Sequence, residues 1–166
     1  MATDLAFDPE DEWTWPRSSG QRQAPPVWQS VHGAYHAIRI RIQKDVADLC
    51  LEASEALVLT YVWSSPGCSP GEIRRALGFH RSTLSSLLGR LEAKGLVQRG
   101  IPGFESRRLM VHLTAQGDAV ATTARALLVD LENELGGWTS PADRRGAGEV
   151  FAACLAMVGP EEIDAS

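Results

Sequence analysis

Apolar residues recur every three or four positions over several stretches of the chain, and this period predicts helices. The first helix starts after Pro26 and runs for about six turns, with an apolar stripe of Trp28, Val31, Tyr35, Ile38, Ile42, Val46 and Leu49. A shorter helix is predicted from Ser54, a good N-cap residue, to the breaker sequence Ser64-Ser65-Pro66-Gly67. Two more helices follow, one from Thr114 to the pair Gly136-Gly137 and one from Ser140-Pro141 onward.

The signals are densest between residues 69 and 117. Ser69, Pro70 and Glu72 have the spacing of a capping box with proline at the first helical position, and Gly78 ends the short helix that they begin. A tight turn leads to a second helix, predicted from Arg81 to Lys94, which has polar residues on one face. Its other face is apolar and consists of Leu84, Leu87, Leu88 and Leu91.

After Gly95 the apolar period changes from 3.6 to 2, which predicts two strands at 96–99 and 109–113. The connection between them, GIPGFESRR, is a Gly/Pro turn with two arginines. Two short helices, a hairpin and a further helix are the order of a winged helix-turn-helix. We therefore expect a mainly α fold with a small β-hairpin wing, flanked by long N- and C-terminal dimerisation helices.

The same pattern gives the domain organisation. Residues 1–26 are acidic and then rich in Pro, Ser, Gly and Gln, so we expect a flexible arm that contains Trp13 and Trp15. Residues 27–166 form a single domain, with the winged helix-turn-helix lobe at 54–114. The helices at 27–50 and 115–158 are expected to dimerise, because they carry more apolar positions than one chain has partners for.

Resemblance to the MarR family of bacterial transcription regulators is carried by GEIRRALGFHRSTLSSLLGRLEAKGLVQR and ESRRLMVHLTAQG. The family pattern is a recognition helix ending in R-L-x-x-K-G-L-V and a wing ending in D-x-R-x-x-x-V-x-L-T-x-x-G. The positions in register are Arg90, Leu91, Lys94, Gly95, Leu96, Val97, Arg107, Val111, Leu113, Thr114 and Gly117. Glu105 replaces the usual Asp, Ser86 stands where a basic residue is frequent, and the wing tip is about one residue longer. The resemblance implies a homodimer that binds double-stranded DNA.

The formal charge of −5 would by itself argue against a nucleic-acid partner, but the charges are unevenly distributed. Residues 69–113 hold eight basic and three acidic residues, a net charge of +5, and the flanking segments are acidic. No stretch approaches the roughly 20 apolar residues of a membrane span, and the acidic N-terminus lacks the features of a signal peptide. We therefore expect a cytoplasmic DNA-binding protein.

The polar face of the second helix supplies the candidate base contacts, because this helix enters the major groove in helix-turn-helix proteins. These candidates are Arg81, Ser82, Thr83, Ser85 and Ser86. Phosphate contacts are expected from Arg74, Arg75, Arg90 and Arg99. The resemblance implies that Arg107 of the wing lies near the minor groove or the adjacent phosphates, and Arg108 would add a phosphate contact. Alternatively, the helix face is only solvated, Ser82 or Thr83 is an N-cap, and Arg107 pairs with Glu105.

An effector pocket is implied only by the resemblance, at the place where the dimer helices meet the winged helix. A small aromatic effector would be lined there by Trp28, His32, Tyr35, Arg39 and Trp63, although aromatic residues at helical spacing are more often core. His32 and His36 are spaced i and i+4, which can bind zinc, but no acidic or thiol ligand lies close by. We predict no metal and no cofactor.

Catalytic motifs are missing from the sequence, so we do not expect an enzyme. Cys50, Cys68 and Cys154 have no C-x-x-C spacing, and buried thiols are the default interpretation. Two other functions stay open. One is a winged helix used as a protein-interaction module, with the acidic tails binding a basic partner, and the other is a metal or redox sensor of the same fold.

Overall fold

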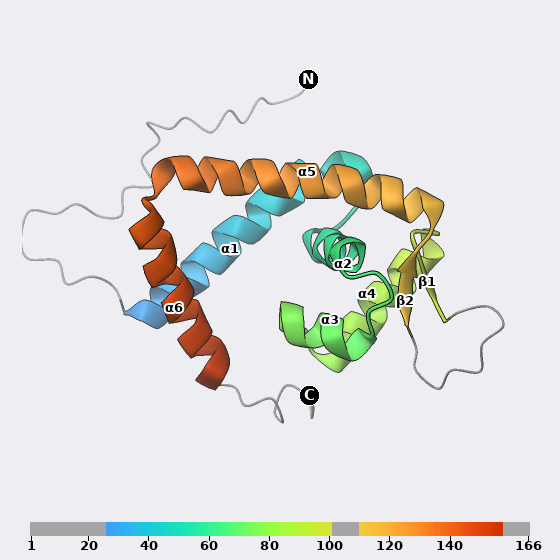
Figure 1. Cartoon of the computed structure of the whole chain (residues 1–166), viewed down its shortest axis with the longest axis horizontal. Coiled ribbons are helices and arrows are strands. Elements are labelled where there is room, and N and C mark those ends of the chain that lie inside the picture. The colour runs from blue at the N-terminus through green and yellow to red at the C-terminus, as the bar shows by residue number, and fades with distance from the viewer. Residues whose placement is uncertain (1–25, 101–109, 158–166) are drawn as a thin grey trace, which may run out of the picture.

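The computed structural model describes residues 26–100 and 110–157, and Figure 1 shows their arrangement. In chain order the elements are α1 (Val27–Asp45), the 3-10 helix η1 (Ala47–Leu49), α2 (Ala53–Ser64), α3 (Pro70–Leu77), α4 (Arg81–Ala93), β1 (Val97–Arg99), β2 (Val111–Leu113), α5 (Ala115–Trp138) and α6 (Pro141–Met157). The predicted class, mainly α with a β-hairpin wing, is confirmed. None of the described helices is long and apolar enough to cross a membrane.

Helix α2 lies at the centre of the fold and packs against α5, α3, α4 and β2 (Figure 1). Strands β1 and β2 are antiparallel, with Val97 opposite Leu113 and Arg99 opposite Val111. We call α2, α3, α4, β1 and β2 together the winged-helix lobe. The long helix α5 passes over this lobe and turns into α6, which lies beyond the lobe on the side of α1 (Figure 1).

Capping residues begin α3 and α5 and end α3 and α4 where the sequence predicts. The Ser69 hydroxyl accepts a hydrogen bond from the Glu72 N–H at 3.3 Å, and the Ser69 N–H donates to the Glu72 carboxylate at 2.7 Å. Gly78, directly after α3, and Gly95, which follows the C-cap Lys94 of α4, adopt the left-handed conformation with φ of 68° and 69°. The Thr114 hydroxyl accepts from the Gly117 N–H at 2.9 Å and so caps α5.

Three helix ends differ from the prediction. Helix α1 stops at Asp45, and the last turn of its apolar stripe is the separate η1, after which Cys50 is left-handed with φ of 55°. Helix α2 begins at Ala53, with Glu52 instead of Ser54 as its N-cap, because Glu55 accepts a hydrogen bond from the Glu52 N–H.

Helix α5 continues through Gly136-Gly137 to Trp138, although each glycine disfavours a helix by about 1 kcal/mol. Arg144 of α6 donates hydrogen bonds to the carbonyl oxygens of Gly136 and Thr139, at 3.1 and 2.8 Å. These bonds satisfy carbonyl groups that would otherwise lack a partner at the helix end, and so they favour the longer helix.

The apolar core lies in the winged-helix lobe and in the parts of α1 and α5 that contact it. The α4 leucines are buried as predicted, whereas Ala76 of α3, whose helical spacing from Ile73 predicts a core position, is exposed. Away from the lobe the helices are uncovered. Every exposed large apolar side chain among the described residues is on α1, the second half of α5 or α6: Val27, Trp28, Tyr35, Ile38, Ile40, Val129, Leu135, Trp138, Val150, Phe151, Leu155 and Met157.

Candidate nucleic-acid interface

Helix α4 has two chemically distinct faces. Its four leucines, Leu84, Leu87, Leu88 and Leu91, are at most 2% exposed and hold the helix against the core. Its opposite face is exposed and presents every residue predicted to contact bases: Arg81, Ser82, Thr83, Ser85 and Ser86. The N-cap is His80, so the alternative that Ser82 or Thr83 caps the helix is wrong.

An open hollow of about 460 Å³ lies between this polar face and the start of α2. Hydroxyl groups from both helices line it, together with the carboxylate of Glu52 and the guanidinium of Arg90. The complete lining is Glu52, Ser54, Ser82, Thr83, Ser86, Leu87 and Arg90. The hollow therefore offers hydrogen-bond donors and acceptors beside the face predicted to contact bases.

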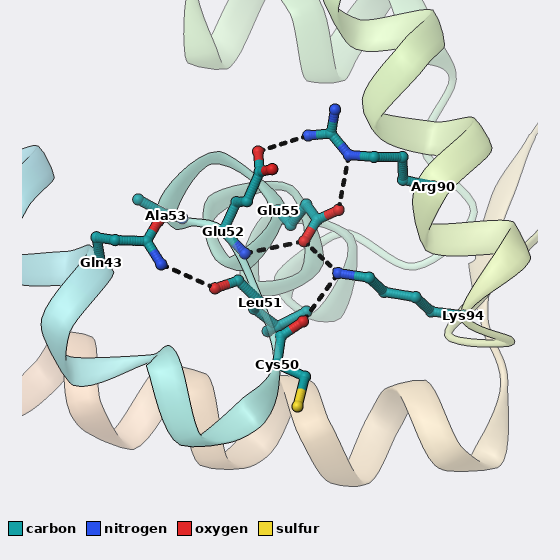
Figure 2. A network of polar contacts seen from close by, with 8 residues as sticks. All are labelled: Gln43, Cys50, Leu51, Glu52, Ala53, Glu55, Arg90 and Lys94. Carbon is teal, nitrogen blue, oxygen red and sulfur yellow. Dashed lines mark hydrogen bonds and ion pairs between the residues drawn. The ribbon is translucent and has the colours of Figure 1, made fainter.

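A buried carboxylate joins α2 to the far end of α4 (Figure 2). The Glu55 side chain is completely buried, and its oxygens accept hydrogen bonds from Arg90 Nε at 3.0 Å and Lys94 Nζ at 2.6 Å. The Glu52 N–H donates a third bond at 2.9 Å, and the Glu52 carboxylate accepts one from Arg90 Nη2 at 2.7 Å. We call Glu52, Glu55, Arg90 and Lys94 the Glu55 cluster.

Opposing effects act on the Glu55 carboxyl. Burial alone would raise its pKa, since a carboxylate is poorly solvated away from water, but the hydrogen bonds from the Glu52 N–H, Lys94 and Arg90 outweigh burial and lower the pKa below 4.5. Glu55 is therefore ionised at neutral pH. It compensates positive charge on a helix whose basic residues were expected to bind phosphate.

Arg99 is held in a similar way at the base of the wing. Its Nε donates to the Glu92 carboxylate at 2.7 Å, its Nη2 forms an ion pair with the same oxygen, and its backbone N–H donates to the other oxygen at 3.2 Å. The hydrogen bonds from Arg99 lower the pKa of Glu92. The structure thus engages Arg90 and Arg99 within the protein, whereas Arg75 and Arg81 are exposed on α3 and α4.

The remaining basic candidates differ in their positions. Arg74 is half-buried on α3 and interacts within the chain, and the Arg75 Nε donates to the Gly71 carbonyl at 3.3 Å. Arg107, Arg108 and the Glu105 that could pair with Arg107 lie outside the described residues, as does the predicted N-terminal arm.

The residues predicted to bind an effector are spread over two helices. Trp28, His32, Tyr35 and Arg39 are exposed on α1, whereas Trp63 of α2 is half-buried with the Arg125 guanidinium 4.8 Å from its ring centroid. Trp28 is 72% and Tyr35 60% exposed, so a site built on them would need a second surface to enclose a ligand. The His32 and His36 rings meet edge to face at 4.5 Å, and no group of three metal-binding side chains occurs among the described residues.

Four residues of this region were not predicted from the sequence: Gln43 and the acidic partners of these arginines, Glu52, Glu55 and Glu92. Glu55 could have been found from its spacing, because it falls one helical turn before Leu59 on the apolar face of α2. A carboxylate at a core position requires a cationic partner. The sequence alone does not indicate which basic residue that partner is.

Comparison with known proteins bears on this lobe in particular. Residues 51–108 match the sequence model of the MarR family. The chain is also 34% identical over 88 residues to the HTH-type transcriptional regulator TtmR of Methylorubrum extorquens (strain PA1), which covers 53% of this chain. The winged-helix lobe is thus similar to the MarR family. The chain spans only 45% of the length of TtmR, so the likeness to that transcriptional regulator is confined to part of each protein.

Solved MarR-family structures share the fold over most of the chain. The S. aureus MepR–DNA complex has a TM-score of 0.71 at 18% identity and covers 81% of this chain and 99% of its own. A Mycobacterium tuberculosis MarR-family protein in complex with salicylic acid has a TM-score of 0.60 at 22% identity, covering 80% and 98%. At these identities the likeness concerns the MarR fold alone.

Proposed function

We propose that the chain is a sequence-specific transcription regulator that binds double-stranded DNA as a homodimer. The observation that carries the proposal is the two-faced α4, whose leucines are buried while Arg81, Ser82 and Thr83 are exposed. A helix presented in this way, next to a hairpin and within a segment of net charge +5, is suited to the major groove. The MepR–DNA complex, which has the same fold, supports this use of the lobe.

The exposed apolar residues of α1, α5 and α6 support the proposed homodimer. A monomer rarely leaves so many large apolar side chains in water, and a two-fold pairing of these helices would cover them. Two recognition helices related by two-fold symmetry would bind a pseudo-palindromic operator whose half-sites are about one helical turn apart.

The proposed DNA contacts fall into two groups, contacts to bases and contacts to phosphates. The exposed end of α4 would select the sequence, with Arg81 suited to the O6 and N7 atoms of guanine and the serine and threonine hydroxyls suited to base edges and phosphates. Arg75 and the wing arginines would contact phosphates and set the affinity for all DNA. Arg74, Arg90 and Arg99 interact within the protein and would contribute less to this general affinity for DNA.

A small aromatic effector would regulate the dimer. The support is the relative that binds salicylic acid, together with the exposed aromatic residues on α1. A ligand that binds one spacing of the two lobes better than another shifts the equilibrium between them by its difference in affinity.

Selection of bound fragments from the host genome tests the proposal. The purified chain is mixed with sheared genomic DNA, bound fragments are sequenced, and a fluorescent copy of the enriched fragment is titrated at several salt concentrations. We expect one enriched pseudo-palindrome, bound more tightly than a scrambled fragment and more weakly as salt rises.

A protein-interaction module is the competing function. The observations in its favour are the net charge of −5 and the carboxylate of Glu52, which lines the hollow beside α4 and would repel a phosphate there. Failure of the chain to retain any DNA at low salt would favour this module and end the first proposal.

A further inference from the structure

The Glu55 cluster joins α2 to α4. It belongs neither to the α4 face proposed to contact bases nor to the exposed apolar surface proposed to form the dimer. Glu55 itself has no exposed surface, so it cannot touch DNA. It binds the last turn of α4, whereas the residues proposed to read bases lie on the first two turns of the same helix. Any rotation or tilt of α4 at its far end moves Ser82 and Thr83 relative to the lobe, because a helix behaves as a stiff rod over three turns.

The geometry of the cluster fixes α4 from two directions. Arg90 and Lys94 are one helical turn apart, and each binds a different oxygen of the one Glu55 carboxylate. Arg90 also reaches Glu52, and Lys94 donates to the Cys50 carbonyl oxygen at 2.9 Å. Two basic side chains are thus attached to the segment 50–55, which limits both sliding and rotation of α4 along α2 (Figure 2).

The same segment is held from its other side by α1. The Gln43 amide donates to the Leu51 carbonyl oxygen at 3.1 Å and accepts from the Ala53 N–H at 2.9 Å. Gln43 therefore attaches α1 to the N-terminal end of α2 through one donated and one accepted hydrogen bond (Figure 2). A continuous set of polar contacts runs from Gln43 on α1, through residues 50–55, to Arg90 and Lys94 on α4.

The charges of the cluster bear on its role. Two carboxylates face two cations, so Arg90 and Lys94 are compensated inside the protein although their side chains remain 42% and 37% exposed. A cation that releases counterions from DNA must neutralise phosphate charge, and a compensated cation does so less effectively. The cluster is therefore better suited to orient α4 than to hold the DNA backbone.

We propose that Glu55 is a positioning residue for the recognition helix: through Arg90 and Lys94 it fixes α4 on α2, and through the segment that Gln43 braces it fixes α4 relative to α1. This inference rests on the proposed DNA-binding function and adds a residue that acts on sequence selectivity without touching DNA. Selectivity, and not general affinity, is the property that it controls.

The test compares the full-length chain with Glu55→Gln on the selected operator and on a scrambled fragment of equal length. We expect the variant to lose about tenfold in operator affinity, since a small displacement of several base contacts removes roughly the energy of one. Affinity for the scrambled fragment should change by less than about twofold, because the phosphate contacts are unaltered. Circular dichroism at the assay temperature checks that the variant is folded.

Two controls separate positioning from stability and from phosphate binding. Val62→Ala removes buried volume from α2 without touching the Glu55 cluster, so its folded protein should keep the wild-type ratio of operator to scrambled affinity. Lys94→Gln should reduce that ratio while leaving the salt dependence of binding unchanged, and should add little when combined with Glu55→Gln. Lys94→Gln also serves if Glu55→Gln does not fold.

The outcomes are distinct. Equal affinity of folded Glu55→Gln and wild type for the operator, or equal losses on both DNAs, overturns the positioning role. A salt slope lower by about one in Lys94→Gln assigns Lys94 to a phosphate and also overturns it. Wild-type protein that binds neither DNA refutes the proposed function instead, before the variants are compared.

Discussion

Arg81 and Arg99 are both arginines of the winged-helix lobe, but their surroundings differ. Arg81 is exposed at the first residue of α4, whereas the Arg99 guanidinium is held by Glu92 at the base of β1. From sequence both appear equally available to DNA. The structure predicts unequal effects, because Arg99 must give up or share an ion pair before it can bind a phosphate.

Replacing Arg81 with Ala is expected to weaken the free energy of operator binding by about 1–3 kcal/mol and to relax the preference at one base pair, because a bidentate contact to guanine is lost. The measurement is titration of the operator and of variants substituted at each position. Arg145→Ala, which removes an exposed arginine from α6, is the matched control and should leave the base preferences unchanged. An equal loss on operator and scrambled DNA would assign Arg81 to the phosphate backbone.

Glu55 gives the folding stability a defined pH dependence. Its pKa in the folded chain is lowered, so the ionised carboxylate stabilises the fold above about pH 4.5 and this contribution is lost as the pH falls below that value. We expect Glu55→Gln to cost about 2 kcal/mol at pH 7, since both cations stay partly solvated. Denaturant unfolding of both proteins between pH 7 and pH 3 should show this difference shrinking.

Other carboxylates do not disturb this measurement. Hydrogen bonds also lower the pKa of Glu92 and of Asp143, from Arg99 and from Ser140 respectively, so acid weakens wild type and variant alike. Only the difference between the two proteins reports on Glu55. A difference that stays constant down to pH 3 would mean that the Glu55 carboxylate is not stabilised in its ionised form.

At the scale of elements, the sequence predicts what depends on local chemistry. The capping residues Ser69 and Thr114 and the glycines at 78 and 95 each act within one turn of the chain, and the structure places them as expected. The α4 leucines likewise follow from helical period alone. The candidate base contacts were identified for the same reason, since they occupy the face that the leucines leave free.

Contacts between distant elements account for what the sequence did not predict. Glu55 and Arg90 are 35 residues apart, and Gln43 reaches a backbone segment on a different helix. Helix α5 passes through two glycines because Arg144 of α6 binds its last carbonyls. Such partners become visible only when the tertiary arrangement is known.

Two glycines of α5 offer a matched pair of substitutions. Gly117 lies against Leu96, the residue before β1, and a methyl group there would overlap the Leu96 carbonyl oxygen, whereas nothing lies within 4 Å of one at Gly137. We expect Gly117→Ala to lower the free energy of unfolding by about 3 kcal/mol. Gly137→Ala should raise it by about 0.5–1 kcal/mol, because alanine favours a helix. Thermal and denaturant unfolding measure both, and similar effects at the two sites would contradict the close contact at Gly117.

At the scale of the whole molecule, the described residues fall into a well-buried lobe and a set of uncovered helices. The lobe presents polar and charged groups outward, and the exposed large apolar side chains among the described residues are confined to α1, α5 and α6. The proposed DNA binding and the proposed self-association would therefore use different surfaces. Variants can therefore affect one without directly altering the other.

Leu155→Glu tests the association surface. Leu155 is 64% exposed on α6, so the substitution should leave the fold of one chain intact while placing a charge in the proposed dimer interface. We expect sedimentation to show a shift from dimer to monomer and operator binding to weaken by at least about tenfold, since the two half-sites are no longer bound together. Glu149→Gln, an exposed change on the same helix, is the control, and an unaltered dimer in Leu155→Glu would exclude this face of α6 from the interface.

The uncovered helices also affect how stability has to be measured. If α1, α5 and α6 are buried only when two chains meet, their ordering is an association reaction, and mass action makes the midpoint of thermal unfolding rise with protein concentration. The core of the winged-helix lobe is completed by the adjoining parts of α1 and α5 and needs no second chain to bury it. Dilution should therefore loosen the uncovered parts of α1, α5 and α6 first. The protein concentration in the cell would then control how many recognition helices are paired.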